Sequence, residues 1–272
     1  APVFDNSKIY IGQQGGEDDF YCLDAETGKL IWKQNVGWVW GSATVSEGLV
    51  FIPGIDGYVI CLDANNGHMI WRFRTDRSVC SEALVIGEYV YFGSWDSFLY
   101  KFEKRTGKLV WKFAGGGSDS GIAIGFEGKI LSPGGGTGGK GMKCIDAETA
   151  ELLWKPEVTG STNATPAYHD GQVFVPLRVG RLLALDSNTG IKNWSYDGPG
   201  FSAPVVGNNG YVYCGAGRNP YFYALDEKGN GDGTTNCLFR VKMANALLES
   251  TPALYRGRAY VLSAGGYFYA IE

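Results

Sequence analysis

The chain repeats one short pattern about every forty residues from beginning to end. In the first copy, FYCLDAETGKLIW at residues 20–32, an aromatic-rich segment runs into Leu-Asp, a polar turn closes on a glycine, and a second apolar segment ends on a tryptophan. An acidic residue precedes each turn, and these residues recur at intervals of 39 to 46 positions. They are Asp24, Asp63, Glu103, Asp146, Asp186, Asp226 and Glu272.

Each repeat carries four short strand signals, bounded by Gly, Asp or Asn and joined by short connections. Repeats of this length that contain only strands are typical of β-propeller blades, which bury their faces against one another. We therefore predict an all-β fold, a seven-bladed β-propeller of four-stranded antiparallel blades that forms a single domain over residues 1–272. The expected blades are residues 1–36, 37–75, 76–114, 115–158, 159–197, 198–243 and 244–272.

The repeated residues have structural explanations. The acidic residue accepts backbone hydrogen bonds across its turn, and the glycine supplies a positive φ. Ala150 replaces that glycine in the fourth repeat, so this turn should be strained or of another type. The tryptophans share one phase, which predicts packing between neighbouring blades. They are Trp32, Trp71, Trp111, Trp154 and Trp194.

The repeat, aromatic-x-(Ala/Cys)-Leu-Asp-x-x-Thr-Gly-x-x-x-Trp, resembles that of the pyrroloquinoline-quinone-like, or quinoprotein-alcohol-dehydrogenase-like, propeller family over essentially the whole chain. The family includes quinone-dependent dehydrogenases, an outer-membrane-assembly lipoprotein and sensor domains of kinases, so fold alone does not assign a function. The resemblance is to the non-enzymatic branch. Quinone-binding members have eight blades, adjacent cysteines and a carboxylate metal site. This chain has seven repeats and no Cys-Cys pair, so no quinone cofactor is expected.

The six cysteines and one enlarged turn were considered as disulfide or metal sites. Cys22, Cys61 and Cys144 share one strand position and are expected to be small buried residues, as is Cys214. A bond between Cys80 and Cys237 is left open. The loop DEKGNGDGTTNC offers Asp226, Asn230 and Asp232 as calcium ligands, but their spacing fits a calcium loop poorly, and a solvated Gly-rich hairpin is the alternative.

The strongest functional signal lies on the upper face, where the connections between blades and the loops between second and third strands are expected to meet. There, equivalent positions of successive repeats carry chemically different residues, whereas a purely structural position would carry the same type in each repeat. We predict an aromatic wall with arginines opposite it as contacts for anions or carbonyl groups; the alternative is a wet channel mouth without a ligand. The candidate residues are Trp38, Trp40, Trp95, Asn163, Arg178, Phe201, Arg218 and Glu249.

The acids Asp56 and Asp96 precede third strands at equivalent positions, which favours a role in turns. Neither has a histidine partner in the expected topology, so we predict no catalytic residues. Twenty-four basic against 28 acidic residues give no footprint for nucleic acid. No apolar run is long enough to span a membrane.

The seventh repeat stops after its third strand signal, which predicts a three-stranded last blade. Such an edge should be covered by further chain or by a partner. The leading hypothesis is a non-catalytic scaffold that binds a protein, peptide or glycan through the upper face, within a larger protein. The rival is an enzyme at the channel mouth, either a degenerate quinoprotein dehydrogenase or a polysaccharide lyase or hydrolase. The family resemblance favours an extracytoplasmic location, in the periplasm or at the cell surface, whereas six mostly unpaired thiols argue against it.

Overall fold

The computed structural model describes residues 2–13, 19–116, 124–132, 141–157, 160, 162, 164–217, 219–244, 251–263 and 265–272. These residues contain 27 strands in seven antiparallel sheets, of which six have four strands and the last has three. Strands pair with their sequence neighbours in every sheet. The predictions of an all-β seven-bladed fold and of a three-stranded last blade are confirmed.

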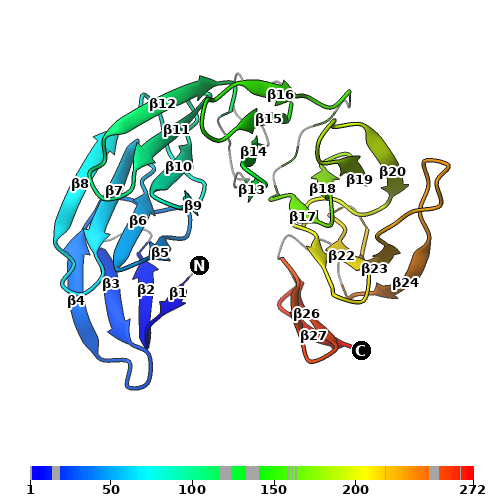
Figure 1. The fold of residues 1–272 in the computed structure, drawn as a ribbon. Helices are drawn as coiled ribbons and strands as arrows, with labels where there is room; N and C mark the ends of the chain where they lie inside the picture. The colour runs from blue at the N-terminus through cyan, green and yellow to red at the C-terminus, as the bar shows by residue number, and fades with distance from the viewer. Residues whose placement is uncertain are drawn as a thin grey trace. The chain divides into compact units, whose positions relative to one another are not determined.

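The chain divides into two compact units with the boundary at Gly125/Phe126. Unit 1 holds the first three blades (Figure 1). Their strands are β1 (Val3–Asp5), β2 (Lys8–Gly12), β3 (Asp19–Asp24) and β4 (Leu30–Asn35); β5 (Thr44–Ser46), β6 (Leu49–Pro53), β7 (Tyr58–Asp63) and β8 (Met69–Arg74); and β9 (Leu84–Ile86), β10 (Tyr89–Gly93), β11 (Phe98–Glu103) and β12 (Leu109–Ala114).

Unit 2 holds the other four blades, except for the first two residues of β13, which belong to unit 1. Their strands are β13 (Ile124–Phe126), β14 (Lys129–Ser132), β15 (Lys143–Asp146) and β16 (Leu152–Trp154); β17 (Ala167–His169), β18 (Gln172–Leu177), β19 (Arg181–Asp186) and β20 (Lys192–Asp197); β21 (Val205–Val206), β22 (Tyr211–Gly215), β23 (Tyr221–Asp226) and β24 (Cys237–Lys242); and β25 (Ala253–Tyr255), β26 (Arg258–Leu262) and β27 (Phe268–Ile271). A single domain over the whole chain stays a prediction.

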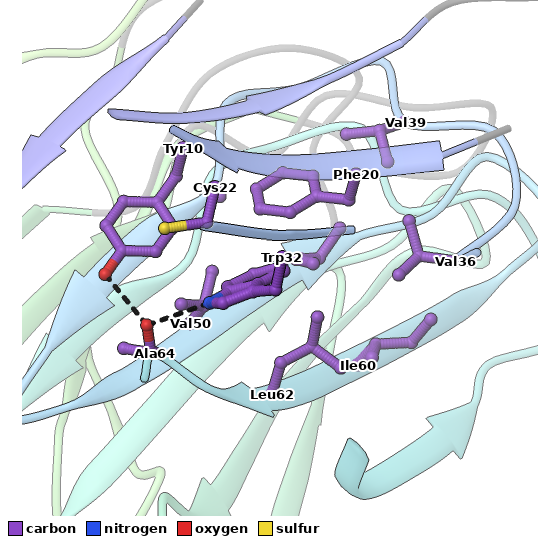
Figure 2. Close-up of a cluster of buried hydrophobic side chains, with 12 residues drawn as sticks. Tyr10, Phe20, Cys22, Trp32, Val36, Val39, Val50, Ile60, Leu62 and Ala64 are labelled. Carbon is purple, nitrogen blue, oxygen red and sulfur yellow. Dashed lines mark hydrogen bonds between the residues drawn. The ribbon is translucent and has the colours of Figure 1, made fainter. Parts of the chain in front are cut away.

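The tryptophan of the outer strand joins a blade to the next one. Figure 2 shows Trp32 and Tyr10 both directed at the carbonyl oxygen of Ala64, in the turn after β7. The indole Nε1–H donates to this oxygen at 3.1 Å, and the Tyr10 hydroxyl donates at 3.2 Å. Phe20 and Leu62 complete the apolar surroundings. The tryptophan therefore buries a large ring while its one polar atom is satisfied.

The same contact recurs within each unit, as the common phase of the tryptophans predicts. Trp71 donates to the carbonyl of Lys104 at 2.9 Å, and Trp154 donates to that of Ser187 at 3.1 Å. Trp194 is 1% exposed and donates to the carbonyl of Glu227 at 2.9 Å. The predicted packing between blades is confirmed for Trp32, Trp71, Trp154 and Trp194, and it stays a prediction for Trp111.

The polar turn also forms as predicted. Asp24 Oδ1 accepts hydrogen bonds from the backbone N–H of Thr27 at 2.7 Å and from its hydroxyl at 2.6 Å. Both bonds favour the ionised carboxylate and hold the pKa of Asp24 below its ordinary value. The chain then reverses at Gly28 with φ of +69°.

Ala150 adopts this glycine conformation in the fourth blade, with φ of +61°, and its N–H donates to the carbonyl of Asp146 at 3.0 Å. The turn therefore keeps its type and is strained.

Replacing Ala150 with glycine should remove about 1–2 kcal/mol of strain from the folded protein. Glycine also gives the unfolded chain more conformational entropy, which offsets about 0.4–1 kcal/mol of that gain. We expect the Ala150→Gly variant to be more stable by roughly 0.5–1 kcal/mol, measured by chemical denaturation. The control Ala25→Gly, at a negative φ, should be less stable; a loss of stability in both variants would contradict the strain.

All six cysteines are free thiols, and only Cys237 is not buried. Burial raises the pKa of Cys61 and of Cys144 to about 12, so both remain protonated near neutral pH.

We expect Ellman's reagent at pH 8 to label Cys237 rapidly in the folded protein and all six thiols after denaturation. Rapid native labelling of Cys61 or Cys144, located by mass spectrometry, would show that these strands open readily.

The outer edge of β27 pairs with no strand among the described residues, since β27 has only β26 as a neighbour. Its covering by further chain or a partner stays a prediction.

No helix in the described part of the chain is long and apolar enough to cross a membrane.

Candidate functional site

The upper-face connections of unit 1 are joined by a series of hydrogen bonds. The N–H of Ile55 donates to the carbonyl of Trp38 at 2.8 Å, and the hydroxyl of Ser78 donates to the carbonyl of Ile55 at 2.6 Å. The N–H of Trp95 then donates to the carbonyl of Ser78 at 2.9 Å. These bonds fix the backbone at Trp38 and Trp95 relative to each other, although 57 positions separate them in the sequence.

Three indoles of these connections are exposed, and together we call them the aromatic rim. Trp38 is 49% exposed, Trp40 62% and Trp95 38%, whereas Trp32 and Trp71 are each 8% exposed. Trp40 also lines a cavity of about 360 Å³ with Pro2, Ile11, Gly12, Val39, Gly41 and Ala43. Large exposed aromatic side chains grouped on one face are typical of binding surfaces.

Asp96 is used to build this face. Its Oδ1 accepts from the N–H of Phe98 at 2.9 Å, and its Oδ2 accepts from the hydroxyl of Tyr100 at 2.6 Å and the N–H of Asp76 at 3.2 Å. Burial and then the bond to Asp96 raise the pKa of Tyr100 well above its ordinary value. Asp56 closes its own turn in the same way. The predicted turn-forming role of both acids is confirmed.

In unit 2, Arg178 lies over the ring of Phe201, with its Cζ 5.9 Å from the ring centroid. Phe201 has φ of +78°, a rare conformation for an aromatic residue. The Phe201 ring leaves no room for a side chain at residue 217, because a Cβ added to Gly217 would lie 2.2 Å from Phe201 Cδ2. Sequence reasoning placed both residues in the candidate site but did not predict this cation–π pair or the strained backbone.

The structure does not test the predicted site as a whole. Asn163, Arg218 and Glu249 lie outside the described residues. Arg178 and Phe201 belong to a different unit from the aromatic rim, so arginines opposite the tryptophans stay a prediction.

The enlarged loop of the sixth blade folds against the fifth. The carbonyl of Gly233 accepts from the N–H of Ser195 in β20 at 3.1 Å. Asp226, Asn230 and Asp232 each accept hydrogen bonds from groups within the loop. Searching the described residues finds no group of three or more His, Cys, Asp or Glu arranged to hold a metal ion. Calcium binding at this loop stays a prediction.

Two charged contacts on the opposite face were missed by sequence reasoning. The side chain of Lys104 is fully buried, and its Nζ lies 2.9 Å from Glu47 Oε2, 3.1 Å from Glu88 Oε1 and 2.8 Å from the carbonyl of Gly87. The hydrogen bond to Glu47 is the largest cause of a raised pKa for Lys104. The only sequence signal is that a lysine replaces the small residue found in this position at Ala25 and Ala64.

The second contact joins the fifth and sixth blades. Nδ1 of His169, at the end of β17, contacts Oε1 of Glu227. The carbonyl of Glu227 also accepts from the amide of Gln172 at 3.1 Å. Each of the two contacts joins neighbouring blades of one unit, so we interpret both as structural.

The model of the family described as outer membrane protein assembly factor BamB matches residues 1–112 and 95–231. A protein of that name from Legionella pneumophila is 24% identical over 197 residues, which cover 68% of this chain and 50% of the relative. Tetrathionate hydrolase of Acidithiobacillus ferrooxidans is 25% identical over 169 residues, which cover 53% of this chain and 34% of the relative. The chain thus spans half or less of the length of these relatives.

The crystal structure of BamB from Moraxella catarrhalis superposes with a TM-score of 0.78 at 20% identity, covering 97% of this chain and 79% of that one. This likeness shows the fold, in agreement with the seven sheets described above. The repeat, the strand order and the family match over most of the sequence agree with the predicted resemblance. The chain belongs to the family described as outer membrane protein assembly factor BamB.

Proposed function

We propose that this chain is a non-catalytic propeller scaffold that binds a protein partner through its upper face, at the aromatic rim. The observation that supports the proposal is the exposure of Trp38, Trp40 and Trp95 on connections whose backbones are fixed by hydrogen bonds. Tryptophan dominates many protein interfaces because it buries a large area and loses little conformational entropy when it is already held.

Membership of a family named for outer membrane protein assembly supports the same kind of function and an extracytoplasmic location. An assembly factor acts by bringing other proteins together, so a rigid surface with exposed aromatic residues suits that role. The alternative is that the same aromatic rim binds a peptide or a glycan.

The proposal is tested by placing the photo-crosslinking residue p-benzoylphenylalanine at position 40 or 95. Leu30 is the matched control position, because it is 55% exposed and lies in the same unit on an outer strand. After irradiation in a Gram-negative cell envelope extract, we expect one protein to be crosslinked from positions 40 and 95 and not from position 30. Trp38→Ala should weaken both crosslinks. Equal crosslinking from position 30, or none from the rim, would contradict the proposal.

The rival function, an enzyme at the channel mouth, is tested with pyrroloquinoline quinone and calcium. A scaffold should show no change in melting temperature with this mixture. A saturable rise, lost when aromatic residues of the rim are replaced, would favour the quinoprotein alternative.

A further inference from the structure

The seam between the fourth and fifth blades is packed differently from two other seams. Between the second and third blades, the ring of Phe73 lies 5.9 Å from that of Tyr100 and 4.9 Å from that of Phe102. Between the fifth and sixth blades, Tyr196 lies 6.0 Å from Tyr223. In both seams, the residue two positions after the outer-strand tryptophan places its ring against the third strand of the next blade. These residues are Phe73 and Tyr196.

Pro156 and Leu183 occupy these positions in the seam between the fourth and fifth blades, so neither side supplies an aromatic ring. Proline also lacks the N–H needed to continue pairing. The outer strand β16 accordingly ends at Trp154, whereas β8 and β20 each continue for three residues beyond their tryptophans. This seam therefore lacks both the rings and the last part of the strand.

The fifth blade also lacks a second filling contact. In three other blades, a cation that follows the outer-strand aromatic residue lies over a ring at the first position of the third strand, 4.6 to 5.2 Å from its centroid. These pairs are Arg72–Tyr58, Lys112–Phe98 and Arg240–Tyr221. The fifth blade has Ser195 and Arg181 at these two positions.

A cavity of about 570 Å³ lies where these groups are missing. Leu177 and Leu183 are apolar parts of its lining, and both are buried. Its charged lining residues are Lys155, Arg181, Lys192 and Glu157. All of these belong to unit 2. Small-molecule sites commonly have volumes of roughly 300–1,000 Å³, a range that includes this cavity.

The charges of this lining favour an anion. Three cations face one carboxylate, and Arg181 pairs with Asp197, with its Nε 2.5 Å from Oδ1. Neither Lys155 nor Lys192 makes an ion pair with any residue that the structure describes. An anionic ligand would reduce the repulsion among these cations, and the planar guanidinium of Arg181 would suit a carboxylate or sulfonate.

We infer that this cavity binds a small organic anion that carries an aromatic ring, such as an aryl carboxylate or an aryl sulfonate. The ring takes the place of the aromatic pair found in the two seams described above and lies against Leu177 and Leu183. The acidic group lies toward Lys155, Arg181 and Lys192. This site is separate from the aromatic rim, so it does not depend on the proposed function.

The test uses two fluorescent probes that differ in one group. The anion 1-anilinonaphthalene-8-sulfonate carries the ring and the charge, and N-phenyl-1-naphthylamine is the same molecule without the sulfonate. We expect saturable 1:1 binding of the sulfonate, with energy transfer from a protein tryptophan. The uncharged probe should bind at least tenfold more weakly.

Two variants then locate the site. Leu183→Tyr introduces the ring that Tyr100 and Tyr223 supply at this position in other blades, and it should abolish the saturable binding. Lys155→Gln with Lys192→Gln should weaken the sulfonate about tenfold, since each exposed ion pair contributes up to about 1 kcal/mol. The uncharged probe should be unaffected. Lys29→Gln with Lys228→Gln removes the same charge outside the cavity and should change nothing.

The inference is overturned if Leu183→Tyr leaves sulfonate binding intact while circular dichroism shows a folded protein. Equal affinity for both probes, or equal losses in the two double-lysine variants, would also overturn it. Because the lysine variants change only exposed side chains, they test the site even if Leu183→Tyr does not fold.

Discussion

Replacing Trp194 with alanine is expected to lower the free energy of unfolding by about 3–5 kcal/mol, the usual cost of removing a buried tryptophan from a packed core. The indole is 1% exposed, packs at a tilt against Phe174 with 5.8 Å between the ring centroids, and donates to the Glu227 carbonyl. The substitution leaves a cavity between the fifth and sixth blades. It also removes one of the two hydrogen bonds that the Glu227 carbonyl accepts, the other being donated by Gln172. Urea denaturation followed by circular dichroism measures the change.

Two matched variants separate these causes. Trp194→Phe keeps most of the ring and loses the hydrogen bond, so it should cost less than the alanine variant. Trp40→Ala removes the same side chain at a position that is 62% exposed, and it should change stability by about 0.5 kcal/mol or less. If Trp40→Ala costs as much as Trp194→Ala, the division between structural and rim tryptophans is wrong.

Replacing Gly190 with alanine should give the second large loss, about 3 kcal/mol or more, from left-handed strain and overpacking together. Gly190 has φ of +70°, and a Cβ there would lie 2.4 Å from Cε3 of Trp154. The turn of the fifth blade lies directly on the tryptophan of the fourth blade, so either the ring or the turn must move. Chemical denaturation of the purified variant measures the loss.

Gly28 provides the control, because its φ of +69° is nearly the same and a Cβ there would meet no atom within 4 Å. Gly28→Ala should therefore cost only the conformational part, about 1–2 kcal/mol. Equal losses at the two positions would mean that close contact with the tryptophan contributes nothing, contrary to the packing described for the seam.

The repeat predicted the local structure well because its residues act over short distances. Asp24 and Thr27 form their bonds within one turn, and the continuous apolar run of a third strand such as Tyr58–Asp63 is buried on both of its faces. The phase of the tryptophans predicted their burial for the same reason. The exception at Ala150 was predicted to be strained or of another turn type, and its φ of +61° shows that the turn keeps its type and is strained.

The candidate site was predicted less completely. The sequence identified Trp38, Trp40 and Trp95 because they depart from the repeat, and the structure shows that they are exposed. It did not predict that Ile55 and Ser78 connect Trp38 to Trp95. Those bonds join residues of the second and third blades, and no pattern within one repeat contains all of them.

The sequence by itself determined the number of sheets, the positions of the strands and the residues that turn the chain, because each depends on neighbours within about forty positions. Only the tertiary structure decided where the seams are filled and where they are open. Pro156, just after β16, and Leu183, within β19, are each compatible with their own repeat. The cavity lined by Leu183 lies where two blades meet without the rings that pack in two other seams, and packing depends on both surfaces at once.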